Sequence, residues 1–262
     1  MLLHDRSGRR YRVVLKTGGS TSLHTGALAH DDLLGQPDGS LVTTARGAVL
    51  LALRPTFAES VVERRRQAQP IYPKDLGAIL VFADLFPGAR VLETGTGTGA
   101  LTIAALRAVG AAGSVVSIEL REEFLEAARE AVADALGGMP ANLDLRLGDA
   151  YQDPGERELD RVLLDLPEPW NAVPWVRAAV VPGGIVFAHC PNVSQVQKFG
   201  EALRAAGGFG LVESFELLQR GWTIRGRSMR PAHRMVAHTG FLTFARRLAG
   251  DKFFESEGEG FA

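Results

Sequence analysis

The chain has 262 residues, of which 46% are hydrophobic and 23% are charged, and its formal net charge is −1. This length allows one large domain, or one ordinary domain together with a small one. No apolar stretch reaches the roughly 18 residues needed to cross a bilayer, which excludes a membrane-spanning helix. The single cysteine, Cys190, excludes a disulfide framework and a cysteine-type zinc site.

These features predict a cytoplasmic protein with no bound metal and no membrane contact, and the first residues lack the apolar segment of a signal peptide. The near-zero net charge gives no support for a nucleic-acid partner, which usually requires a basic patch. Two local clusters could supply such a patch. One is Arg64–Arg66. The other has no acidic residue between its ends and consists of Arg220, Arg225, Arg227, Arg230 and Arg234.

Residues 1–60 contain short alternating runs separated by turn signals, which predict a small N-terminal β domain. Its expected strands are Arg10–Leu15, Ser40–Thr44 and Ala48–Arg54. Residues 56–75 are polar and basic, and they are interpreted as a connector with a short helix that ends before Pro70. A second domain is expected over residues 61–249, followed by a disordered tail over residues 250–262, which is rich in glycine and glutamate.

From Asp75 onward, apolar runs of strand length alternate with runs of helical period. The expected helices are Leu76–Leu85, Ala100–Val109, Arg121–Leu136, Trp175–Val181 and Val193–Ala206. The expected strands are Ala89–Leu92, Ser114–Leu120, Leu143–Leu147, Arg161–Leu166, Ile185–Cys190, Leu211–Leu218 and Phe241–Ala245. This alternation predicts βαβ units, and so an α/β fold with a doubly wound, Rossmann-like parallel sheet.

A glycine-rich segment, Glu93–Ala100, follows one predicted strand and opens the next helix. Glycines at such a place let the chain turn sharply and let a ligand approach the backbone. The spacing Gly95-x-Gly97-x-x-Ala100 fits a dinucleotide fingerprint, and it fits the glycine loop of methyltransferases equally well. The loop therefore predicts a nucleotide-like ligand, with NAD and S-adenosylmethionine both open.

Three carboxylates near this loop favour S-adenosylmethionine. Glu93 directly precedes the glycines, where a negative charge would repel a pyrophosphate but suit an ammonium and a sulfonium. Glu119 ends the second strand, where it can accept ribose hydroxyls. Asp149 follows the third strand and can accept an adenine amine. The predicted cofactor-binding residues are Glu93, Gly95, Thr96, Gly97, Thr98, Gly99, Ala100, Glu119, Asp149, Ala150 and Asp165.

The catalytic candidate is Asp165, in the segment LLDLPEPW at the end of the fourth strand, where strand ends face the ligand crevice. Its carboxylate could accept a hydrogen bond from an exocyclic amine and hold the neighbouring ring nitrogen in line with a methyl group. It would also stabilise the cation that forms. Base-modifying enzymes flip their target base into a pocket, where Trp170 could stack, although it could equally pack in the core. Glu168 is expected to be solvated.

Further motifs occur in order along the chain, and each lies at a predicted loop or strand end. They are HTGALAHD at His24–Asp31, IYPKD at Ile71–Asp75, LETGTGTG, LLDLPEPW, CPNVSQ with Gln195 as a polar anchor, LQRGW, RPAH and the pair His238-Thr239. Together they resemble the tRNA (adenine-58-N1) methyltransferases of the bacterial and archaeal type over residues 8–248. Thr94 and Thr98 depart from the alanine and serine that this family more often carries there.

The resemblance implies transfer of a methyl group from S-adenosylmethionine to N1 of adenine 58 in the tRNA T-arm. It also implies a homotetramer with a small N-terminal β domain in each subunit. Asp165 would contact the target adenine with Tyr72 beside it, and Glu119 and Asp149 would bind the cofactor. The substrate-binding candidates are Trp170, Arg220, Trp222, Arg230, His238 and Thr239.

Other functions stay open on the residues alone. The glycine spacing also suits an NAD-dependent oxidoreductase, and a fold of this class does not fix the substrate, so a protein methyltransferase fits it too. A third possibility is a non-catalytic tRNA-binding subunit. Such a subunit would be expected to lack the glycine loop or the carboxylate of Asp165, and this chain has both.

Overall fold

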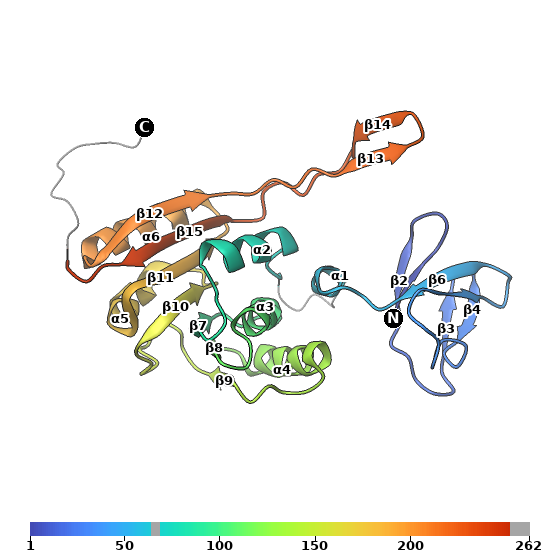
Figure 1. Ribbon diagram of the computed structural model, residues 1–262, viewed down its shortest axis with the longest axis horizontal. Helices are drawn as coiled ribbons and strands as arrows, with labels where there is room; N and C mark the ends of the chain where they lie inside the picture. Colours follow the sequence, from blue (N-terminus) through green and yellow to red (C-terminus); the bar gives the residue numbers. More distant parts are fainter. Residues whose placement is uncertain (64–68, 252–262) are drawn as a thin grey trace. The chain divides into compact units, whose positions relative to one another are not determined.

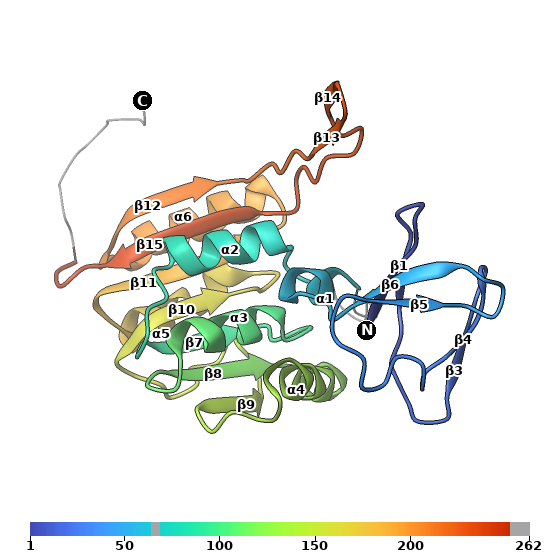
Figure 2. The same cartoon turned by 45° about the vertical axis from the view of Figure 1, so that its right-hand side comes forward.

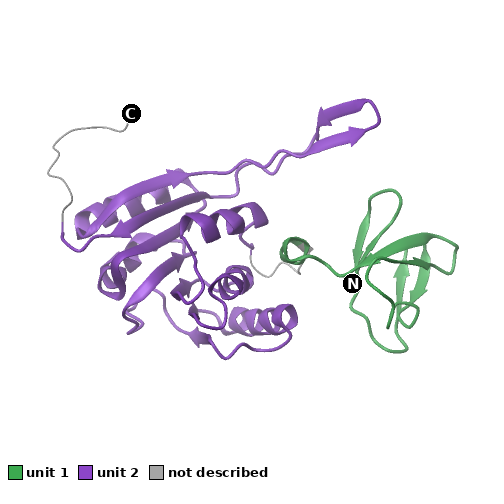
Figure 3. Cartoon of the chain, viewed as in Figure 1, with its two compact units in different colours: residues 1–65 green, residues 66–262 purple. Residues whose placement is uncertain are grey.

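The computed structural model describes residues 1–63 and 69–251. The chain divides into two compact units, residues 1–65 and residues 66–262 (Figure 3). The arginine cluster Arg64–Arg66 and most of the glycine-rich tail lie outside the described residues. No described helix has the length and apolar character needed to cross a membrane.

The first unit is built from short antiparallel strands, as the turn-rich sequence predicts. Its four-stranded sheet has the order β2-β1-β6-β5, and a separate hairpin pairs β3 with β4 (Figure 2). These elements are β1 (Leu2–His4), β2 (Arg10–Arg12), β3 (Ser20–Leu23), β4 (Gly26–Ala29), β5 (Ser40–Thr43) and β6 (Val49–Leu53), followed by α1 (Phe57–Glu63). A small core that includes Leu3, Leu28 and Leu50 holds the unit together.

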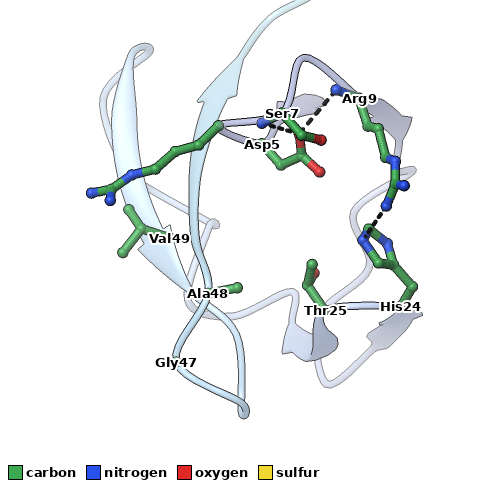
Figure 4. A pocket seen from close by; sticks show the side chains of 9 residues that line it. Asp5, Ser7, Arg9, His24, Thr25, Gly47, Ala48 and Val49 are labelled. Atoms are coloured by element: carbon green, nitrogen blue, oxygen red, sulfur yellow. Dashed lines mark hydrogen bonds between the residues drawn. The ribbon is translucent and has the colours of Figure 1, made fainter.

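The HTGALAHD motif belongs to this unit, and its two histidines have different surroundings. His30 is buried beside β4 and contacts the Thr21 hydroxyl at 2.7 Å. His24 is exposed at a hollow of about 450 Å³, where Arg9 donates to its Nε2 at 2.7 Å (Figure 4). The hollow is lined by Asp5, Arg6, Ser7, Arg9, His24, Thr25, Gly47, Ala48 and Val49.

The second unit is a seven-stranded sheet of order β12-β15-β11-β10-β7-β8-β9 (Figure 1). All neighbouring strands are parallel except at β15, which is antiparallel to both β11 and β12. The strands are β7 (Arg90–Thr94), β8 (Ser114–Glu119), β9 (Leu143–Leu147), β10 (Leu159–Leu164), β11 (Val180–Cys190), β12 (Phe209–Phe215) and β15 (Phe241–Arg247). The predicted α/β, doubly wound fold with a small N-terminal β region is confirmed.

Helices cover both faces of this sheet. One face carries α2 (Pro73–Phe82), α3 (Ala100–Val109) and α4 (Glu122–Leu136), and the other carries α5 (Val173–Ala179) and α6 (Val193–Ala206) (Figures 1 and 2). The chain winds outward from β7 in one direction through β8 and β9, and in the other through β10 and β11. This reversal between β7 and β10 is a topological switch point, where open α/β sheets bind ligands.

Several boundaries differ from the expected ones. The structure begins α5 at Val173, after a 3₁₀ turn at Pro169–Ala172, and extends β11 back through Pro182 and Gly183. Pro182 and Gly183 lie where the register between β10 and β11 shifts, so they belong to an irregular part of the strand. The strand expected at Leu211–Leu218 is Phe209–Phe215. The sequence analysis also missed β1, β3 and β4, which are four residues or fewer.

Residues 216–240 form an arm between β12 and β15, and the sequence analysis did not predict it. The arm contains a two-stranded hairpin of β13 (Trp222–Arg225) and β14 (Ser228–Pro231), which extends away from the sheet in Figure 1. At its base, Gln219 and Val236 form an isolated antiparallel bridge. The arginine cluster from Arg220 to Arg234 therefore lies on this arm.

Candidate functional site

A buried polar network around Glu93 supports the glycine loop. The Oε2 atom of Glu93 accepts hydrogen bonds from the hydroxyls of Thr102, at 2.5 Å, and Ser117, at 2.8 Å. Because Ser117 donates to Glu93, it must accept from Thr96, whose hydroxyl lies 2.7 Å away. The network joins β7, β8 and the start of α3, and so fixes the conformation of the loop.

Burial changes the electrostatic role expected of Glu93. Its side chain is 0% exposed, and burial raises its pKa to about 8 although the two hydroxyls oppose that shift. Burial therefore favours the neutral form of this carboxyl group and weakens the repulsion of a pyrophosphate expected here, and that repulsion stays a prediction. The Oε1 atom is buried without a partner among the described residues. A cofactor contact at Glu93 stays a prediction.

The central feature of the site is the close approach of Gly95 to Asp165. Neighbouring strands β7 and β10 pair Thr94 with Leu164, so the residues that follow them come together. The Asp165 backbone N–H donates to the Thr94 carbonyl at 3.0 Å. A Cβ atom at Gly95, which has a φ of +80°, would lie only 2.1 Å from the Asp165 carbonyl oxygen. Only glycine fits this position, and it brings the loop directly against the catalytic candidate.

The other predicted cofactor residues line the same edge of the sheet. Glu119 is 5% exposed and accepts a hydrogen bond from the Gly97 N–H at 2.9 Å, so it is already bound to the loop. Asp149 is exposed and accepts from the Tyr151 N–H at 3.0 Å, and Ala150 beside it is buried. A carboxylate has about four acceptor positions, so both acids keep lone pairs for ligand hydroxyls or amines.

Tyr72 occupies the N-cap position of α2 and is half-buried. The helix starts there because Pro73 has the fixed φ suited to a first turn. Lys74 and Asp75 anchor this turn to Thr239 at the end of the arm. Lys74 contacts Asp75 at 2.6 Å and the Thr239 hydroxyl at 2.5 Å, and Thr239 donates to Asp75 at 2.5 Å. Thr239, predicted to bind substrate, is thus engaged with this buried ion pair.

The turn after Asp165 is fastened to α6. The Gln195 side-chain amide donates to the Pro167 carbonyl at 2.7 Å, and Gln195 also completes the capping box of α6 with Asn192. The predicted role of Gln195 as a polar anchor therefore has a structural counterpart. Trp170 is half-buried, with the Lys198 ammonium 4.8 Å from its ring centre. Glu168 is exposed, as expected.

His189 contacts the catalytic candidate and was not predicted from the sequence. Its Nδ1 atom lies 3.1 Å from Oδ1 of Asp165, and its side chain is 11% exposed. The available signal was its place at the end of the strand Ile185–Cys190, on the same edge as Asp165. Recognising the contact also required knowing that β10 and β11 are neighbours, which the sequence does not show.

The substrate candidates on the arm are not gathered around Asp165. Arg220, Trp222 and Arg230 are exposed, and Arg230 donates to His233 at 2.8 Å. The side chain of Trp222 is 63% exposed and does not pack in the core. His238 lies at the end of the arm, where it contacts Glu216 and Pro191. No group of three or more potential metal ligands occurs in the described parts of the chain.

Replacing Gly95 by alanine should destabilise the protein by about 3 kcal/mol or more, since overpacking against backbone adds to the cost of a positive φ. The matched control is Gly137→Ala, where φ is +78° and nothing lies within 4 Å of the added Cβ. The control should cost only about 1 kcal/mol. Urea unfolding measures both. Equal losses in the two variants would contradict the close approach.

His238 should stabilise the arm most strongly when it is protonated. Its Nε2 lies 2.8 Å from the Pro191 carbonyl oxygen and its Nδ1 2.9 Å from the Glu216 carboxylate, and both groups only accept hydrogen bonds. These contacts, the carbonyl first, raise the pKa of His238. A raised folded-state pKa gives stability that is present below the unfolded pKa and is lost as the pH rises through the folded value.

The difference in melting temperature between the parent protein and His238→Ala should therefore be largest near pH 6 and shrink toward pH 9. Glu216→Gln should reduce this pH dependence without abolishing it, because it takes away the charged partner while the Pro191 carbonyl contact remains. A difference that grows with pH would show that the imidazole is neutral in the fold.

Comparison with known proteins connects this site to one family. The model for the tRNA methyltransferase complex GCD14 subunit matches residues 48–233, and the TrmI-like N-terminal model matches residues 1–42. The chain is 38% identical to the tRNA (adenine(58)-N(1))-methyltransferase TrmI of Thermus thermophilus over 94% of this chain and 96% of that protein. A relative from Methanocaldococcus jannaschii, named as an adenine-57 and adenine-58 N1-methyltransferase, is 29% identical over 94% of each chain.

Solved structures agree with these matches. A SAM-dependent O-methyltransferase from Thermotoga maritima superposes with a TM-score of 0.90 at 28% identity and covers 96% of this chain and 94% of that one. The tRNA (m1A58) methyltransferase TrmI of Aquifex aeolicus gives a TM-score of 0.78 at 29% identity, with 94% and 96% covered. The chain belongs to the tRNA (adenine-58-N1) methyltransferase family.

Proposed function

We propose that the protein transfers a methyl group from S-adenosylmethionine to N1 of adenine 58 in the T-arm of tRNA. The observation that carries the proposal is the place of Asp165, whose backbone lies directly against Gly95 of the glycine loop at the switch point of the sheet. The names of the relatives supply the nucleotide and the atom.

The residues at the sheet edge fit S-adenosylmethionine. The amino acid part of the cofactor would lie against the backbone of the Gly95–Gly99 loop, since glycines let a ligand approach the main chain closely. Glu119 would accept the ribose hydroxyls, and Asp149 with Ala150 would hold the adenine ring. When bound, the cofactor supplies an electrophilic methyl group on a sulfonium centre.

Asp165 would act on the target adenine through hydrogen bonding and charge. Adenine carries an exocyclic amine next to N1, and a carboxylate that accepts from that amine fixes where the N1 lone pair points. Methylation at N1 leaves a positive charge on the ring, which the same carboxylate stabilises as it develops. Tyr72 would flank the base from the start of α2, and Trp170 is the candidate for stacking.

The arm offers one face suited to tRNA phosphates. Residues directly opposite in an antiparallel pair share a face, and the hairpin pairs Thr223 with Arg230 and Arg225 with Ser228. Both arginines are exposed on this polar face. With Arg220 they would contact the phosphate backbone, which explains how a chain with a net charge of −1 can bind RNA.

The opposite face of the hairpin is apolar, which supports assembly into a homotetramer. It pairs Trp222 with Pro231 and Ile224 with Met229. The side chains of Trp222, Ile224 and Met229 are 63%, 69% and 69% exposed. An isolated two-stranded hairpin is marginal in water, and adjacent exposed apolar side chains mark interaction surfaces. We propose that a further copy of the chain covers this face.

We also propose that the enzyme acts on tRNA in the cytoplasm.

Replacing Asp165 by alanine should lower kcat for methyl transfer to unmodified tRNA by about 100-fold or more, the usual cost of losing a group that stabilises developing charge. Asp165→Asn should fall between, since its amide oxygen still accepts a hydrogen bond but carries no charge. Glu168→Gln is the matched control, because Glu168 is exposed in the same turn. Transfer from labelled S-adenosylmethionine gives the rates. Equal activity in Asp165→Ala and Glu168→Gln would refute the role of Asp165.

A further inference from the structure

His189 reaches Asp165 through the register of two neighbouring strands. The pairing of β10 with β11 places Leu164 opposite Ala188, so Asp165 and His189 are the next residues on each side. Their side chains meet at 3.1 Å between Oδ1 and Nδ1. His189 is held on both sides along its own strand, since β11 also pairs with β15 and sets His189 opposite Leu242. The histidine is therefore part of the rigid sheet.

The surroundings of the other ring nitrogen determine the tautomer. The Nε2 atom of His189 is buried and has no hydrogen-bond partner among the described residues. A Cβ atom built on Gly240 would lie 2.2 Å from it, so the ring fits tightly against the backbone at the end of the arm. An N–H group at this position would be a buried donor without an acceptor, which costs more than an unpaired lone pair. These surroundings place a proton on Nδ1, which donates a hydrogen bond to Asp165.

The two carboxylate oxygens of Asp165 therefore differ in their hydrogen-bond partners. His189 donates to Oδ1, and no described residue forms a hydrogen bond with Oδ2. The Asp165 side chain is 31% exposed, and Oδ2 is the oxygen that keeps its lone pairs free of contacts with the described residues. A carboxylate held by a fixed donor keeps one rotamer, and such preorganisation determines whether a catalytic group is aligned when the charge develops.

We propose that His189 is a positioning residue for Asp165, whose Nδ1–H holds Oδ1 so that Oδ2 is presented to the exocyclic amine of the target base. This inference rests on the proposed function for the identity of the base, and on the structure alone for the hydrogen bond. Gly240 is needed for the same hydrogen bond, because any larger residue there would displace the imidazole ring of His189.

Three variants of the full-length protein test the proposal. His189→Asn keeps an N–H donor near the position of Nδ1, whereas His189→Leu keeps much of the side-chain volume without a donor. The third combines His189→Leu with Asp165→Ala. We expect His189→Leu to lower kcat by about 10-fold, within the usual range for directly coupled residues. The KM values for S-adenosylmethionine and tRNA should change by less than about 3-fold, because a positioning residue acts through Asp165 and not on either ligand.

His189→Asn should restore most of the lost kcat, and His189→Leu should cause no further loss when Asp165 is already alanine. Melting temperatures identify any variant whose fold is damaged. Equal losses in His189→Asn and His189→Leu, or a full 10-fold loss in the Asp165→Ala background, would overturn the positioning role.

A second measurement does not depend on activity. Nitrogen-15 spectra of the histidine side chains in the ligand-free protein should show a proton on Nδ1 of His189. A ring protonated on Nε2 alone, which has no proton to donate to Asp165, would overturn the proposal. If the protein fails to methylate tRNA while the Nδ1–H tautomer is observed, the proposed function is wrong and the hydrogen bond to Asp165 still stands.

Discussion

The contact between the backbone of Gly95 and the carbonyl of Asp165 is the constraint on which the site depends. The ends of β7 and β10 approach so closely that no side chain fits at Gly95. The loop predicted to hold the methyl donor and the carboxylate predicted to hold the acceptor are therefore joined in one rigid piece of backbone. Transfer between two bound molecules requires such a fixed relation, because small errors in alignment are costly in rate.

Buried polar groups keep this relation fixed from two directions. On one side, Glu93 ties β7 to β8 and α3 through the hydroxyls of Ser117 and Thr102. On the other, His189 joins β11 to Asp165. The base of the arm adds a third connection, in which Thr239 joins the ion pair of Lys74 and Asp75 at the start of α2. The site is thus set mainly by regular elements of the sheet and their first helical turns.

Much of the second unit could be predicted because its elements are long and regularly patterned. The helix expected at Ala100–Val109 and the strand expected at Leu143–Leu147 have the observed bounds. The short strands of the first unit carry too few residues for a period to be visible, as in Leu2–His4. The arm hairpin was missed because its apolar residues are exposed and its arginines resemble a polar loop.

Contacts across neighbouring strands were the main part of the site that the sequence could not supply. The carboxylates Glu119, Asp149 and Asp165 were placed correctly at one edge, because parallel strands end together. The burial of Glu93 and the contact of His189 with Asp165 depend on which strands are adjacent and in which register. The same holds for the arm, where the pairing of Ile224 with Met229 separates an apolar face from a basic one.

The most direct test of the account is the position of the methyl group in the product. Unmodified tRNA should be incubated with the purified protein and S-adenosylmethionine, then digested and mapped by mass spectrometry. The account predicts 1-methyladenosine at position 58, the nucleotide named for the Thermus relative. A methyl group on an oxygen, on another kind of base or on the protein itself would contradict it.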